Sequence, residues 1–257
     1  MATIDFTADH VRGTYAIVER GHGGRDIAVG LGLIAFDGLG GLTGRLSRNV
    51  PGARFGERDI LELSGSGTYA VTPSGLVSAS LGGGDDTLRL AVRTVGIEAD
   101  GSLRVNELAM IGRDLDGASG CLMTGTATRH PDRSVFAASS LNGLYVGAAF
   151  ADGGQSPAAG FGFVRYDGQG RFGETNMANI QGDTTTSRRF VDGADEGAYT
   201  LEADGFGSVG DGGVRILVTH AMVKDDITRV EAYAFIVQSL VPATGALFTG
   251  TVRRVGD

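Results

Sequence analysis

The stretch Phe36-Asp37-Gly38-Leu39-Gly40 returns as Tyr166-Asp167-Gly168-Gln169-Gly170, about 130 positions further along the chain. Outward from this motif the match continues at the same offset, with the pairs Tyr15/Tyr145 and Tyr69/Tyr199. Near the end of each copy the offset shortens to about 125, where Gly120–Thr126 meets Gly245–Thr251. The chain is therefore a tandem duplication, which predicts two domains, residues 1–130 and 131–257.

Each copy consists of short segments rich in β-branched and aromatic residues, separated by Asp-Gly or Gly-Gly pairs. The strands expected in the first copy include Gly13–Arg20, Ile27–Phe36, Gly67–Thr72, Leu88–Ile97 and Arg104–Ile111. Because no segment has a helical period, we predict an all-β fold. Glycine within a strand permits sharp coiling, so the pairs Gly30/Gly32 and Gly160/Gly162 favour barrels over a sandwich. The prediction is two tandem antiparallel β-barrels of eight or nine strands each.

Composition excludes several classes of function. The net charge of −8, without a basic stripe, argues against a nucleic-acid partner. The sequence shows no secretion signal and no apolar run long enough to cross a membrane. A single cysteine makes a reducing cytoplasm the expected compartment. No His or Cys residues stand at metal-ligand spacing, so we expect neither a metal site nor a cofactor.

Positions that both copies share are interpreted as scaffold. Asp37 and Asp167 are predicted to form turns, because an aspartate can accept hydrogen bonds from the turn that it begins. The duplicated tyrosines are predicted to pack in the barrel core. Glu19, Arg20 and His22 have no polar equivalents in the second copy except Asp152, and we interpret them as solvated residues at a strand end, with a ligand contact at the barrel mouth as the alternative.

One copy resembles small bacterial barrels of the lipocalin-like or allene-oxide-cyclase-like type. The resemblance comes from Gly-x-Tyr in the first strand, Phe/Tyr-Asp-Gly-x-Gly after the second, Gly-Thr/Ala-Tyr in the middle and Thr-Gly-Thr-x-x-Arg at the end. The chain has no tryptophan, so the Gly-x-Trp sequence of lipocalins is absent, as is a cyclase catalytic motif. The resemblance implies an interior that holds a small, mostly apolar molecule, either bound or converted without a cofactor.

The two copies differ most informatively in the segment Val214–Val237. A symmetric hairpin through Lys224–Ile227 places His220 opposite Glu231, whereas the first copy has Thr94 and Asn106 at these sites. A carboxylate beside an imidazole can serve as a proton-transfer unit. Tyr233 would then stabilise an oxyanion as the third catalytic residue, and the predicted ligand contacts are Arg229, Val218, Met222 and Phe235.

Two alternatives stay open at this hairpin: the face points outward, or a register shift separates His220 from Glu231. The leading hypothesis is a cofactor-free isomerase, lyase or cyclase that acts on a small apolar metabolite by acid–base chemistry. The alternatives are a carrier for a small hydrophobic ligand and, third, a module that serves only for assembly. The expected partner is a small hydrophobic molecule, with no nucleic acid and no membrane, and a homodimer is left open.

Overall fold

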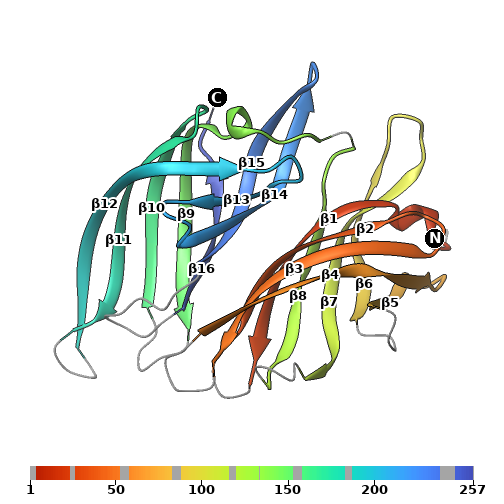
Figure 1. Ribbon diagram of the computed structural model, residues 1–257. Coiled ribbons are helices and arrows are strands. Elements are labelled where there is room, and N and C mark those ends of the chain that lie inside the picture. Colours follow the sequence, from red (N-terminus) through yellow and green to blue (C-terminus); the bar gives the residue numbers. More distant parts are fainter. Residues whose placement is uncertain are drawn as a thin grey trace. The chain divides into compact units, whose positions relative to one another are not determined.

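The computed structural model describes residues 4–23, 27–52, 58–82, 88–115, 120–132, 134–152, 158–182, 187–237 and 247–256 (Figure 1). Its sixteen strands form two closed antiparallel barrels of eight strands each. The predicted all-β fold of two tandem barrels is confirmed. The chain divides into two compact units, of which the first includes Ile60–His130 and the second Pro131–Asp257. The described residues contain no α-helix, and none of their short helices is long or apolar enough to cross a membrane.

Barrel 1 follows the chain order from β1 to β8 and closes where β1 pairs with β8. A short 3-10 helix, η1 (Asp9–Val11), precedes it. The strands are β1 (Gly13–His22), β2 (Val29–Phe36), β3 (Gly41–Pro51), β4 (Arg58–Val71), β5 (Leu76–Leu81), β6 (Leu88–Ile97), β7 (Leu103–Leu115) and β8 (Leu122–Arg129).

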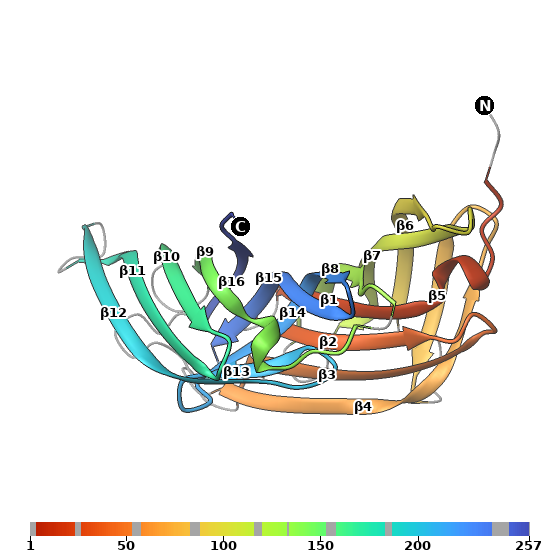
Figure 2. The ribbon, with the colours of Figure 1, turned by 90° about the horizontal axis from the view of Figure 1, so that it is seen from above.

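Barrel 2 repeats this arrangement after a second 3-10 helix, η2 (Ala138–Ser140), and closes where β9 pairs with β16. The view from above shows β9 to β12 side by side, in the order that their pairing requires (Figure 2). The strands are β9 (Asn142–Asp152), β10 (Ala158–Asp167), β11 (Arg171–Gln181), β12 (Arg188–Leu201), β13 (Phe206–Val209), β14 (Val214–Lys224), β15 (Ile227–Val237) and β16 (Leu247–Arg254).

The repeated Asp-Gly motif forms the turn between the second and third strand of each barrel. Asp37 Oδ1 accepts hydrogen bonds from the backbone N–H of Leu39 (2.7 Å) and Gly41 (2.9 Å). Asp167 Oδ1 accepts the equivalent bonds from Gln169 (2.7 Å) and Arg171 (3.0 Å). These bonds favour the charged carboxylate and hold the pKa of each aspartate below its ordinary value. Both aspartates are turn formers, as predicted.

Two duplicated tyrosines fasten the core of each barrel to its backbone. Tyr15 and Tyr145 are fully buried, and their hydroxyls donate to the carbonyl oxygens of Val105 (2.8 Å) and Val230 (2.9 Å). The hydroxyls of Tyr69 and Tyr199 hold the 3-10 helices, donating to the carbonyl oxygens of Ala8 (3.2 Å) and Ala138 (2.8 Å). The predicted scaffold role of these tyrosines therefore has a specific form, which is a hydrogen bond from the phenol to a backbone carbonyl group.

Both barrels carry the same double irregularity, one in the hairpin β6–β7 and one in β14–β15. In barrel 2 the pairs Val218↔Tyr233 and Ala221↔Val230 flank a single pair, His220↔Ala232. In barrel 1 the pairs Val92↔Leu108 and Val95↔Val105 flank Thr94↔Glu107 in the same way. Each strand therefore contains one unpaired residue, which reverses the face that the following residues occupy. The extra residues are Arg93, Asn106, Thr219 and Glu231.

Candidate functional site

The predicted hairpin register is correct over most of β14 and β15 and wrong at the predicted site. Val214 pairs with Val237 and Lys224 with Ile227, as a symmetric turn requires, and Asp225 and Asp226 in the turn have positive φ angles of 53° and 60°. At the double irregularity, however, His220 lies opposite Ala232. The assumption of regular alternation fails because Thr219 and Glu231 are the extra residues of the bulges.

His220 and Glu231 consequently do not form the predicted proton-transfer pair. Ala221 packs against the core of barrel 2, so the adjacent His220 is on the opposite, exposed face. Glu231 bonds Arg229 instead, with 2.7 Å between Arg229 Nε and Glu231 Oε1. The side chains of Arg229 and Glu231 are 33% and 36% exposed, so this is a half-exposed ion pair.

The remaining predicted residues are divided between the two faces of the hairpin. Met222 is 41% exposed and does not contribute to an inner wall. Val218 is fully buried in the core of barrel 2. Tyr233 and Phe235 line a cavity inside the barrel. Of the seven predicted site residues, the structure therefore places these two at a cavity, and it separates them from His220 and Arg229.

The cavity of barrel 2 has a volume of about 620 Å³ and mostly apolar walls. Glycine and alanine on β9 and β10 leave room in its interior, and side chains of β11 to β16 complete the lining. Most of these are aliphatic or aromatic, and the polar ones outside the tyrosines are Glu174, Asn176 and Arg189. Val191 lines it and is 39% exposed, so the cavity is open to solvent beside β12. β13 has only four residues and pairs with β12 at Tyr199–Leu201, so Val191 lies beyond the part of β12 that β13 covers.

Two phenols provide the buried polar group of this cavity. The hydroxyls of Tyr166 and Tyr233 lie 2.8 Å apart, and the side chains are 2% and 3% exposed. Burial raises the pKa of both phenols above the ordinary value of 10, so both stay protonated at neutral pH. Within the described residues, each hydroxyl bonds only the other, so one of the two O–H groups is left to donate to a further acceptor.

A carboxyl group lies on the same lining. Glu174 Oε1 accepts a hydrogen bond from Asn176 Nδ2 at 2.6 Å, and both residues contribute to the cavity wall. Burial raises the pKa of Glu174 and the nearby Asp195 carboxylate raises it further, while the bond from Asn176 opposes this shift. In the first copy Gly44 and Leu46 occupy these positions, so the pair is specific to barrel 2.

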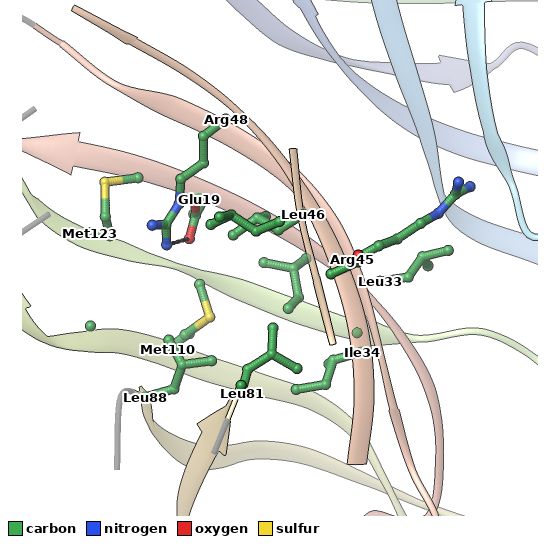
Figure 3. Close-up of a pocket in the computed structure, with 16 residues that line it drawn as sticks. Glu19, Leu33, Ile34, Arg45, Leu46, Arg48, Leu81, Leu88, Met110 and Met123 are labelled. Carbon is green, nitrogen blue, oxygen red and sulfur yellow. Dashed lines mark hydrogen bonds and ion pairs between the residues drawn. The ribbon is translucent and has the colours of Figure 1, made fainter. Parts of the chain in front are cut away.

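Barrel 1 has its own cavity of about 410 Å³, also largely apolar (Figure 3). Its polar feature is an ion pair between Glu19 on β1 and Arg48 on β3. Arg48 Nε donates to Glu19 Oε1, and Arg48 Nη2 donates to Glu19 Oε2 at 3.2 Å. The Glu19 side chain is 1% exposed, so the interpretation of this residue as a solvated strand end is wrong.

The two barrels thus place polar groups at different positions of one scaffold. Barrel 2 has Ala149 and Ala178 where barrel 1 has Glu19 and Arg48. Conversely, barrel 1 has Phe36 and Leu108 where barrel 2 has Tyr166 and Tyr233. In each case two residues that contact each other in one barrel are both replaced in the other barrel. Within the described residues, no three His, Cys, Asp or Glu side chains gather as a metal site would require.

Comparison with known proteins does not assign the chain to a family. No family model matches the chain, and no curated protein matches it. A solved structure described as a porin-like protein from Bacteroides uniformis aligns with 98% of both chains at 10% identity, with a TM-score of 0.20. A similarity of this size supports no conclusion about fold or function.

Proposed function

We propose that the protein binds a small, uncharged and mostly apolar molecule inside barrel 2. The observation that carries this proposal is the cavity of about 620 Å³ with mostly apolar walls and a buried phenol pair. Binding sites for small molecules have volumes of about 300–1,000 Å³ and combine apolar walls with a few polar groups that fix orientation. The cavity has both properties.

The phenol pair identifies the polar group that the ligand needs. Because the pKa values of Tyr166 and Tyr233 are raised, the pair offers an O–H donor and not a negative charge. A carbonyl oxygen of the ligand can accept this hydrogen bond, while the rest of the molecule contacts aliphatic side chains such as Ile216 and Val252. A ketone, ester or amide on a hydrocarbon body therefore fits better than a charged compound.

Acid–base catalysis in the same cavity is the second candidate function, and Glu174 is the observation that favours it. A carboxylate with a raised pKa is a stronger base than an ordinary one. The O–H of the phenol pair could stabilise an enolate oxygen that forms when this base removes a proton. On this hypothesis Glu174→Gln abolishes turnover of the true substrate and leaves its binding intact, whereas a carrier has no turnover to lose.

Binding is tested by titrating the full chain with acetonaphthone, a neutral aromatic ketone. Six valines and no leucine line the cavity within the described part of barrel 2, so valine methyl signals in NMR spectra report on this site. The valines are Val164, Val191, Val209, Val214, Val237 and Val252. We expect their signals to shift on titration, and the dissociation constant follows from the shifts.

Ala149→Phe is the variant that fills the cavity, because Ala149 lies on its wall. We expect it to weaken acetonaphthone binding at the valine signals by about tenfold or more. Thr251→Phe is the matched control: Thr251 is exposed on β16, and the adjacent Val252 lines the cavity from the other face. Equal affinity in wild type, Ala149→Phe and Thr251→Phe would contradict the proposal, as would unshifted valine signals.

A further inference from the structure

The ion pair in barrel 1 is almost completely withdrawn from solvent. The Glu19 side chain is 1% exposed and the Arg48 side chain 16%, and both line the cavity of about 410 Å³. Figure 3 shows the two side chains pointing toward each other from neighbouring walls, with Leu46, Met110 and Met123 around them. Arg48 is therefore the more exposed partner of the pair.

The scaffold itself does not require this pair. Barrel 2 closes with the same eight strands in the same order, and it has Ala149 and Ala178 at the equivalent positions. Removing two charges from water is costly, and a buried ion pair often contributes less to stability than apolar residues of similar size. A role beyond folding therefore accounts for the pair better than stability does.

The surroundings of the pair define a ligand with an apolar body. The cavity is lined by Ile34, Leu46, Leu81, Leu88, Met110 and Met123. Methionine side chains adapt to ligands of different shape because they are flexible and polarisable. Apart from the ion pair and Arg45, Ser64 is the only polar side chain on the described lining, and Arg45 points away from the cavity in Figure 3.

We propose that barrel 1 is a second binding site, which takes an uncharged, mostly apolar molecule with an oxygen acceptor such as a carbonyl group. Arg48 donates a hydrogen bond to this oxygen, because it lines the cavity, is more exposed than Glu19 and has five N–H donors. Glu19 orients Arg48 through two hydrogen bonds and neutralises its charge. A ligand carboxylate would bring a second negative charge beside Glu19, so the pair selects against anions.

The test compares acetonaphthone with naphthoate, which has the same aromatic body and a carboxylate in place of the ketone. Five leucines but no valine are among the described residues that line this cavity, and no leucine lines the cavity of barrel 2, so leucine methyl signals separate the two sites. The titrations use the full chain with Ala149→Phe, which fills the other cavity. We expect acetonaphthone to bind barrel 1 about tenfold or more tightly than naphthoate.

Two further variants separate selection by charge from a structural role. Glu19→Gln removes the negative charge that lies beside Arg48, so naphthoate should bind about tenfold more tightly than it does with Glu19 present. Glu19→Ala combined with Arg48→Ala reproduces the residues of barrel 2, and it should weaken acetonaphthone binding by about tenfold. Circular dichroism and the midpoint of urea unfolding check that each variant is folded.

Three results would overturn the proposal. The first is that the leucine signals do not shift with acetonaphthone. The second is that naphthoate binds the chain with Glu19 and Arg48 intact as tightly as the ketone. The third is that the ratio of the acetonaphthone affinity to the naphthoate affinity is the same in all variants, which would assign the ion pair a structural role alone. None of these results depends on binding in barrel 2.

Discussion

The hydrogen bond between Tyr166 and Tyr233 makes a quantitative prediction about barrel 2. Tyr233→Phe leaves the Tyr166 hydroxyl buried without its partner, and Tyr166→Phe does the same to Tyr233. An unsatisfied buried hydroxyl costs about 1–3 kcal/mol, so each single variant should lose that much free energy of unfolding. The double variant removes both hydroxyls and leaves two phenyl rings of nearly the same shape, so it should be about as stable as wild type.

The measurement is a double-mutant cycle from urea unfolding followed by circular dichroism. The predicted coupling is about 2–6 kcal/mol, the sum of the two single losses, since the double variant loses almost nothing. Tyr199→Phe combined with Tyr233→Phe is the control, because the Tyr199 hydroxyl bonds the carbonyl oxygens of Ala138 and Leu141 and not Tyr233. If the losses in free energy of unfolding of the two single variants add up to that of the double variant within about 0.5 kcal/mol, the hydrogen bond between Tyr166 and Tyr233 is refuted.

The same geometry leads to three further predictions. Because the pKa of Tyr233 is raised, the folded chain binds more protons than the unfolded chain above pH 10, so stability falls as pH rises through that range. The urea midpoint of unfolding should therefore fall more steeply with pH in wild type than in the variant with both Tyr166→Phe and Tyr233→Phe. Parallel curves for the two proteins would contradict this prediction. The raised pKa of Glu174 likewise costs stability once pH rises above the ordinary value of 4.5. The melting temperature of Glu174→Gln should therefore rise relative to that of wild type as pH increases from acidic to neutral. If the difference between the two melting temperatures does not change with pH, burial does not perturb this carboxyl group. Gly250→Ala would place a Cβ atom 2.2 Å from the carbonyl oxygen of Ala148, so it should lower the free energy of unfolding by about 2 kcal/mol or more. Gly173→Ala is the control and should be nearly neutral, because a Cβ atom there meets nothing within 4 Å. Equal free energies of unfolding for the two variants would contradict the close approach at Gly250.

The fold was predictable because its signals are local. The aspartate of each Asp-Gly motif bonds backbone N–H groups two and four residues ahead, so the turn depends on neighbouring residues alone. The hairpin at Asp225-Asp226 fixed the register of β14 and β15 over most of their length in the same way. Strand order then follows from short connections between antiparallel neighbours.

The predicted site failed because a β-bulge depends on tertiary packing. The carbonyl of Val230, next to the extra residue Glu231, is held by Tyr145 from a strand 85 residues away. Strict alternation ignores such a contact, so it placed His220, Glu231 and Tyr233 on one face. Two of these side chains are on the outer face and Tyr233 is on the inner face.

The polar groups of the cavities left a signal in the sequence that could have been used. Glu19 and Arg48 both become alanine in the second copy, and Phe36 and Leu108 both become tyrosine. Pairs that change together are expected where side chains touch. Alternation from buried Tyr15 and Ile17 also places Glu19 on the inner face of β1.

The most direct test of ligand binding in barrel 2 is a crystal structure of the full chain with acetonaphthone. The proposal predicts the naphthalene rings among the aliphatic side chains of the cavity and the ketone oxygen within about 3 Å of the hydroxyl of Tyr166 or Tyr233. A cavity without the ketone at saturating concentration, or a ketone bound only on the outer surface of the barrel, would contradict it.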